Sequence, residues 1–476
     1  MHIATIISHR KFSVRKFFPF AVFAVFAIAA LAACDHHQST TPAANSSPVA
    51  QIQPSAPLSA DDVSILFPAP KTASDFANLI AVKDISAPNP QDATKRDPVW
   101  SDSAFQQFIT IVNGPAATAG SAQISLPVEA RVIDAWFVSG IRIDAGAPGL
   151  SSDIHAQYGQ LPEIRLIIQP VLKNPDGSPK ALDIAAHLIF DFITLPPDPP
   201  PAADCFPRFQ PDPAVFKSVV ADLTDLRTRL NNGQIANHPV STAGVPLGVH
   251  PALADPATAN AMRNELLSFL GKHISASRLG SMAITGLPAN APAPWIYLSI
   301  LGDRQGHFGP AHGPTLDGAQ QFAEMLTPAG SPGPRVVPAP HTNNLNPITC
   351  KNAAVSATSL PIAQRNGVAT AELFATPAPA PDRIQQVADT IADPTKSFFF
   401  NTDCVSCHTE TRRTMDLLKV TSVPGIDTAA LPNGQWDIRN FGWGDNAGKP
   451  FLQPTVTRRT ANETAAVVNF LNSQPK

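Results

Sequence analysis

Short apolar runs with alternating or continuous hydrophobic positions fill the first third of the chain. The clearest cover residues 130–143, 164–172 and 184–193, and an Asn-Pro-Asp-Gly segment at 174–177 supplies turn chemistry between the last two. Runs of this length and period are typical of β-strands. We therefore predict a β-rich domain over residues 61–204, built on a mainly antiparallel sheet.

In the middle third the apolar positions change to helical spacing. An Asp-Pro pair at 212–213 has the form of a helix cap followed by proline, and apolar residues then recur every three or four positions up to Gly233. The same pattern predicts further helices over 255–270 and 317–326 and strands over 282–287 and 295–301. We predict a mixed α/β unit over residues 205–375.

The last segment begins after alternating prolines at 376–381, which favour an extended chain. Apolar residues on one face predict a helix over 383–391. Thr460 to Glu463 fit a capping box ahead of an apolar stripe at 467–471, which predicts a terminal helix. Residues 376–476 are therefore predicted to be all-α, and the whole chain to be an α+β multidomain protein.

The first 33 residues carry the features of a secretory signal. Basic residues between Arg10 and Lys16 are followed by an uncharged apolar run from Phe17 and then by small residues. This order predicts a signal peptide at 1–33. The alternative is an ordinary signal or an uncleaved anchor in which the following cysteine is coincidental.

The sequence Leu-Ala-Ala-Cys at 31–34 resembles the bacterial lipoprotein box, which implies lipidation of Cys34. Asp35 resembles the enteric signal that keeps lipoproteins in the inner membrane. Residues 34–60 lack periodicity and are rich in Ser, Thr, Pro and Ala, which predicts a flexible tether. The expected location is the periplasmic side of the bacterial cell envelope, with contact to the membrane through the lipid anchor.

Composition limits the function classes. A chain of 476 residues with 44% hydrophobic content is long and apolar enough for two or three domains with cores. Its 50 prolines predict many irregular connections. A net charge of −3 offers no basic surface for nucleic acid.

Cys404, Cys407 and His408 form a C-x-x-C-H sequence, the most informative motif in the chain. Two thiols at this spacing can each add to one vinyl group of a haem, while the adjoining imidazole binds the iron. We predict one covalent haem c, with His408 as the proximal iron ligand. One alternative is a chance grouping of two cysteines and a histidine. The others are a thioredoxin-like redox pair, which needs a βαβ setting, and a zinc site, which needs further Cys or His ligands nearby.

Two cysteines, Cys205 and Cys350, have no role in lipidation or haem attachment. Thiols in an oxidising compartment favour pairing, so we predict a disulfide between them. The alternative is two separately buried free cysteines.

A helix, the C-x-x-C-H motif, loops and a terminal helix with an inner aromatic make the last segment similar to the class I c-type cytochromes. The resemblance implies that the first and last helices cross at one edge of the haem, that Cys404 and Cys407 form the thioether links, and that His408 is the proximal ligand. It also implies a methionine as second axial ligand, but segment 438–444 contains none. Met415 is too close to His408 along a continuing helix to reach the opposite side without strain.

Several residues remain candidates at the second axial position. They are His307, His312 and His341 from the upstream unit, and Asn440 beside an open position. Arg439 and Trp436 are candidate hydrogen-bond donors to the haem propionates; the alternative is that both are domain-surface residues. We expect either an upstream histidine or a five-coordinate iron.

The state of that position decides the function. Two axial ligands favour outer-sphere electron transfer, whereas an open position permits ligand binding or peroxide chemistry. The first hypothesis is a mono-haem electron-transfer lipoprotein with an unidentified redox partner. The alternatives are a peroxidase-like haem oxidoreductase and a haem-bearing binding or sensor lipoprotein, because no familiar catalytic motif precedes residue 376.

Overall fold

The structure is a computed structural model that describes residues 57–114, 118–119, 122–124, 126–145, 162–194, 210–286, 295–302, 306–310, 321–323, 336–337, 373, 377–396, 404–434 and 437–473. The predicted signal peptide, the lipidation site Cys34 and the predicted disulfide partners Cys205 and Cys350 lie outside these ranges. All described residues belong to one compact unit, Ser55–Lys476. Within them, no helix has the length and apolar character that crossing a bilayer requires.

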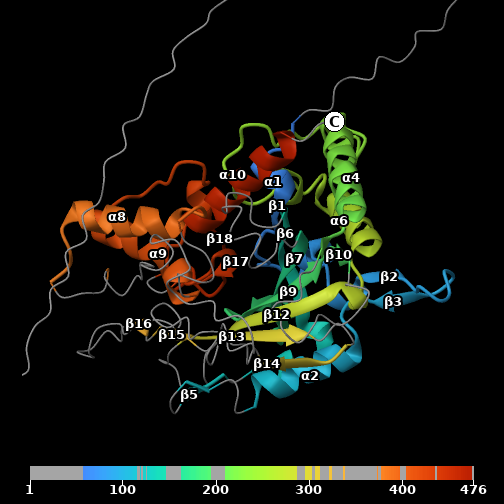
Figure 1. Ribbon diagram of the computed structural model, residues 1–476, viewed down its shortest axis with the longest axis horizontal. Coiled ribbons are helices and arrows are strands. Elements are labelled where there is room, and N and C mark those ends of the chain that lie inside the picture. Colours follow the sequence, from blue (N-terminus) through green and yellow to red (C-terminus); the bar gives the residue numbers. More distant parts are fainter. Residues whose placement is uncertain are drawn as a thin grey trace, which may run out of the picture. The chain divides into compact units, whose positions relative to one another are not determined.

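A ten-stranded antiparallel sheet is the largest element of this unit (Figure 1). Its strands follow the order β1-β6-β7-β9-β12-β13-β15-β16, with β8 paired to β7 and β14 to β13. Their bounds are β1 Ser64–Leu66, β6 Trp136–Asp144, β7 Glu163–Lys173, β8 Pro179–Ala181, β9 Ala185–Asp191, β12 Leu279–Gly286, β13 Trp295–Gly302, β14 Phe308–Pro310, β15 Gln321–Ala323 and β16 Val336–Val337. The five long strands β6, β7, β9, β12 and β13 coincide with the five apolar runs of the sequence, which confirms those strands.

Smaller elements complete the upstream part of the unit. Two-stranded sheets are formed by β2 Ser86–Pro88 with β3 Arg96–Pro98, β4 Thr118–Ala119 with β5 Ala122–Gln123, and β10 Ile193–Thr194 with β11 Gln210–Pro211. The helices are α1 Ala60–Val63, α2 Asp102–Val112, α4 Pro213–Asn231, α5 Pro251–Ala254 and α6 Ala259–His273. Short 3-10 helices at Val128–Arg131 and Ile133–Ala135 delay the start of β6 relative to the run at 130–143.

Helix α4 begins and ends where the sequence predicts. The side chain of Asp212 accepts a hydrogen bond from the backbone N–H of Val215 at 3.1 Å, and Pro213 has no N–H that would need a partner. Gly233, just beyond the helix, has a φ of +68°, a left-handed conformation that favours glycine. The predicted second helix is also present as α6.

Residues 321–323 of the predicted helix 317–326 form strand β15 instead. The strand pairs with β13 through Tyr297 and Gln321 and with β16 through Phe322 and Val337. Because both edges of β15 are paired, sheet hydrogen bonds outweigh the weak helical periodicity of this short segment.

The long strands give the sheet two different faces because successive side chains alternate across it. One face is apolar, with side chains such as Ile141, Leu166 and Leu188. These side chains form the main hydrophobic core together with buried residues of α2, α4 and α6. The other face supports the C-terminal segment and carries the candidate site.

The C-terminal segment contains α8 Pro381–Ala392, α9 Cys404–Leu418 and α10 Arg458–Ser473, and also the paired strands β17 Phe441–Gly444 and β18 Gln453–Val456. The all-α domain predicted for residues 376–476 is therefore not what the described part of this segment shows. The physical reason lies in packing: Phe441 of β17 lies on Gly140 of β6, where a Cβ would stand only 2.7 Å from the aromatic ring. The hairpin covers the sheet where a loop was expected.

The C-terminal segment shares its core with the upstream part of the chain. Trp443, Val467 and Leu471 belong to the main hydrophobic core. The side chain of Asn472 accepts a hydrogen bond from the backbone N–H of Leu58 and donates one to its carbonyl, both at 2.9 Å. Residues from all three predicted domains thus meet in one core.

Candidate functional site

The second face of the sheet is charged over part of its area. Strand pairing places Arg142 of β6 opposite Arg165 of β7. On β9, His187 lies between Ile167 of β7 and Ala283 of β12. The opposite end of this face is apolar, where residues of β7 and β9 form a second, smaller hydrophobic cluster with the C-terminal segment.

Part of the charged end remains accessible to solvent. Six residues at alternate positions of three adjacent strands are half-buried, while the residues on either side of each are buried. They are Glu163, Arg165, His187, Ile189, Ser281 and Ala283. We call this set the half-buried patch. Two of its members, Ser281 and Ala283, have short side chains. Along β12 the surface of the patch therefore lies closer to the sheet backbone than it does along β7 and β9.

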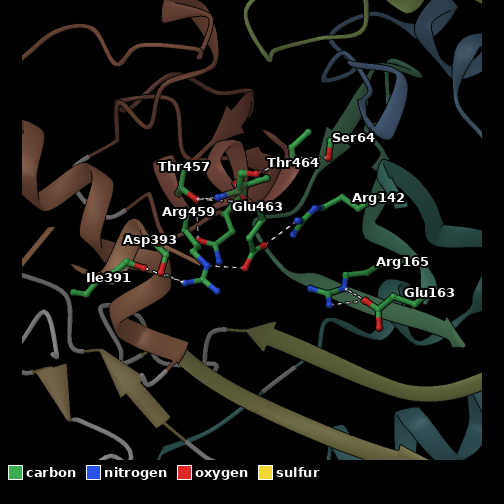
Figure 2. A network of polar contacts seen from close by, with 12 residues as sticks. Ser64, Arg142, Glu163, Arg165, Ile391, Asp393, Thr457, Arg459, Glu463 and Thr464 are labelled. Carbon is green, nitrogen blue, oxygen red and sulfur yellow. Dashed lines mark hydrogen bonds and ion pairs between the residues drawn. The ribbon is translucent and has the colours of Figure 1, made fainter. Parts of the chain in front are cut away.

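Figure 2 shows the ion pairs that connect this face to α10. Glu463 accepts hydrogen bonds from Arg142 at 2.8 Å and from Arg459 at 2.6 Å. On the sheet, Arg165 pairs with Glu163 at 2.6 Å. Arg459 also donates to carbonyl oxygens at the end of α8, so one guanidinium connects two helices.

The pKa values of the two carboxyl groups are shifted in opposite directions. Burial raises the pKa of Glu163 to about 7, and Arg165 opposes the shift without cancelling it. Burial also acts to raise the pKa of Glu463, but Arg459 and Arg142 outweigh it and hold that pKa at about 2. Glu463 is therefore ionised at neutral pH, whereas Glu163 titrates close to it.

His408 lies on the first turns of α9 and meets the sheet at Tyr297 of β13. The two ring centroids are 4.9 Å apart, at an interplanar angle of 62°. Nδ1 of His408 lies 2.6 Å from the backbone oxygen of Ile438. A carbonyl oxygen can only accept, so Nδ1 carries the proton and donates it. Nε2 is then left with a free lone pair, which is the form of imidazole that binds metals.

Burial lowers the pKa of His408 to about 4; the hydrogen bond to Ile438 opposes this shift, and Arg439 and Arg165 add to it. The ring is therefore neutral at pH 7.

The cysteines of the motif lie on the same helix. Cys404 is the first residue of α9, and its side chain lies outside what the structure describes. Cys407 is half-buried and packs against the small apolar cluster formed by α8 and Leu373. Cys407 also lies near the ion pairs of α10, since a negative charge on its thiol would raise the pKa of Arg459. Among the described residues, no group of three or more His, Cys, Asp or Glu side chains is arranged to hold a metal ion without a cofactor.

Arg439 is almost fully buried, with 1% of its side chain exposed, and only part of its hydrogen-bonding capacity is used. Nη2 donates to Asp183 at 2.8 Å, whereas Nε and Nη1 have no hydrogen-bond partner in the described part of the chain. Burial raises the pKa of the neighbouring Asp437 to about 8, so that carboxyl is mostly protonated at pH 7. A buried guanidinium with two unused donors suits an anionic group.

Several residues singled out in the sequence lie elsewhere. Met415 packs against the second hydrophobic cluster. Asn440 braces α10, since its backbone oxygen accepts from Thr457 at 3.0 Å and from Thr460 at 3.1 Å. His307 is exposed just before β14. His312, His341 and Trp436 lie outside the described ranges.

Sequence reasoning missed His187, Arg142 and Arg165, which the sheet brings to the same face. The available signal was a charged or titratable residue within each of three apolar runs. Its meaning depends on the strand register, which the sequence does not supply. No protein-family model, curated protein sequence or solved structure matches the chain.

Proposed function

We propose that the chain binds one haem c covalently through Cys404 and Cys407, with His408 as an axial iron ligand, and transfers electrons at the bacterial cell envelope. The state of His408 carries this proposal. Its Nδ1–H is fixed by the Ile438 carbonyl at 2.6 Å, and its Nε2 is left as an acceptor. A histidine held in this way binds iron without losing its hydrogen bond.

The surroundings fit the two carboxylates of a haem. Arg439 has two buried N–H donors without a partner, one residue beyond the carbonyl that fixes His408. This supports the role expected for Arg439 as a donor to a propionate. The half-buried patch lies on the sheet face that His408 meets through Tyr297, so a flat aromatic group has a surface to rest on.

Bound haem supplies one-electron iron chemistry. In this proposal His408 would offer the iron a neutral imidazole, and Arg439 would match the charge of a propionate. The signal peptide at 1–33 and the lipid on Cys34 would place this centre on the periplasmic side of a membrane, with the inner membrane favoured by Asp35. A disulfide between Cys205 and Cys350 would form in the same compartment.

The proposal predicts a haem-staining band on a denaturing gel of the full-length protein expressed with a haem-attachment system. Cys404→Ser and Cys407→Ser together should abolish the stain, because no thioether can form. Cys205→Ser replaces a cysteine outside the motif. This matched control should still stain for haem. Haem that extracts fully into acidified solvent from the unaltered protein would refute covalent attachment.

The half-buried patch supports a second candidate, a haem oxidoreductase or sensor in which a small molecule binds beside the iron. Glu163, with its pKa of about 7, is a group in the patch that can exchange protons at neutral pH. Rapid binding of carbon monoxide by the reduced, unaltered protein would favour this candidate over electron transfer.

A further inference from the structure

Most histidines in the described ranges already have a polar partner. His238 lies 3.4 Å from Asp255, and His273 lies 2.7 Å from Asp222. His250 caps a helix, with its Nδ1 accepting from the backbone of α5 at 3.1 Å. These three side chains have structural roles and are not free to bind iron.

His187 differs from them. Neither ring nitrogen makes a hydrogen bond to any described residue, although the ring is only half-exposed on the sheet. An imidazole has one donor and one acceptor, and on this half-buried ring both are left to solvent or to a bound group. Burial, with the nearby Arg165, lowers the pKa of His187 well below its usual value, so the ring is neutral. A neutral, unpartnered imidazole is a ready metal ligand.

The sheet register places His187 close to His408. Tyr297, which contacts His408, pairs with Thr285 of β12. Thr285 pairs in turn with Ala185, which lies two residues before His187 on the same face of β9. Two strand spacings amount to about 10 Å across the sheet, and the two residues from Ala185 to His187 add about 7 Å along it.

A small residue stands beside His187 on its β12 side. Its cross-strand neighbour on that side is Ala283, a half-buried residue with a single methyl group. On the other side, Ile167 is buried beneath the C-terminal segment. The imidazole therefore lies beside the β12 side of the half-buried patch, where the side chains are short.

We infer that His187 is the second axial ligand of the iron, on the opposite side of the haem from His408. The inference rests on the proposed haem function and specifies it. The ligand comes from the β-sheet, so the upstream part of the chain and the C-x-x-C-H helix each supply one face of the site. Two imidazoles close the iron to small ligands, which favours electron transfer over the oxidoreductase and sensor alternatives.

The test compares the visible and electron paramagnetic resonance spectra of the full-length holoprotein with those of His187→Ala. The unaltered protein should be low-spin with a bis-histidine signature and should bind carbon monoxide slowly. His187→Ala should become high-spin, bind carbon monoxide at least tenfold faster after reduction, and return to low-spin when imidazole is added. His307→Ala removes an exposed histidine and should leave every spectrum unchanged.

The outcomes separate this inference from the proposed function. If neither the unaltered protein nor any variant carries covalent haem, the proposed function fails. If haem is covalent but His187→Ala stays low-spin without imidazole, or the unaltered protein is already high-spin, only the ligand inference fails. His187→Met is a second variant for the case in which alanine disturbs folding. It should stay low-spin with a higher reduction potential than the unaltered protein.

Discussion

At the scale of single residues, Glu463 holds the charged side of the site together. It pairs with Arg142 on the sheet and with Arg459 on its own helix, and the two cations hold its pKa at about 2 against a usual value of 4.5. A depressed carboxyl pKa stabilises the fold above the unfolded pKa, and this stability is lost as the pH falls through the folded value. A shift of this size corresponds to about 3 kcal/mol.

Glu463→Gln should therefore lower the free energy of unfolding by about 3 kcal/mol at pH 7. The unaltered protein should lose a similar amount between pH 5 and pH 2, and the variant should lose less over that interval. Urea titrations at several pH values measure both effects. Glu129→Gln, at an exposed position, should change neither. An identical pH dependence in Glu463→Gln and the unaltered protein would show that this carboxyl does not control acid stability.

At the scale of elements, the contact between β6 and β17 fixes the C-terminal hairpin on the sheet. A Cβ at Gly140 would lie 2.7 Å from the ring of Phe441, whose side chain is buried. Gly140→Ala should destabilise the protein by about 1–3 kcal/mol, because neither the strand nor the ring has room to move. Thermal unfolding measures the loss.

Gly309→Ala is the matched control, since no atom lies within 4 Å of the added methyl group. Adding Phe441→Leu to Gly140→Ala should recover part of the stability, because leucine has no ring to collide with the methyl. If Gly140→Ala is as stable as the control, the packing of the hairpin on β6 is looser than described.

Elements with a strong hydrophobic periodicity were predictable from the sequence. The long strands and α4 follow from apolar spacing and from the Asp212 cap, which depend only on local chemistry. The hairpin β17–β18 was not, because its strands are short and are held by a distant glycine on β6. Glu463 shows the same limit. The sequence suggests a capping box with Thr460, but α10 begins at Arg458. Glu463 accepts hydrogen bonds from two guanidinium groups instead. Arg142, far along the chain, and Arg459, one helical turn away, together outcompete one local backbone N–H.

The candidate site was predictable only in part. The C-x-x-C-H motif is local, so it marks Cys404, Cys407 and His408 without any structure. The expectation that Arg439 binds a carboxylate stays a prediction; the structure shows that its side chain is buried with two N–H groups that have no partner among the described residues. His187 depends on the pairing of β9 with β7 and β12, which only the folded sheet supplies.

At the scale of the whole molecule, the C-terminal segment depends on the sheet for its core. Trp443 donates its indole N–H to the carbonyl of Phe67 at 2.9 Å, and Val467 and Leu471 are buried in the main core. Each buried apolar side chain stabilises by about 1.5–3 kcal/mol. Residues 377–476 expressed alone should therefore show no cooperative unfolding transition by circular dichroism.

The matching experiment cuts the folded full-length chain at a protease site introduced into the exposed linker at 377–380. The two pieces should remain associated on gel filtration and unfold together. An isolated segment that unfolds cooperatively, or a cut protein that separates under native conditions, would mean that the segment is an independent domain.

The paired hydrogen bonds between Leu58 and Asn472 have a consequence for the maturation of the protein. On the proposed export route a chain arrives from its N-terminal end, so the sheet strands would emerge before α9 and long before residue 472. The two hydrogen bonds cannot form until that last helix has arrived. If haem is attached as proposed, the two thiols of the motif would be open to the attachment machinery during this interval. The order of export would then give the enzyme that loads the haem access to the motif before the fold is complete.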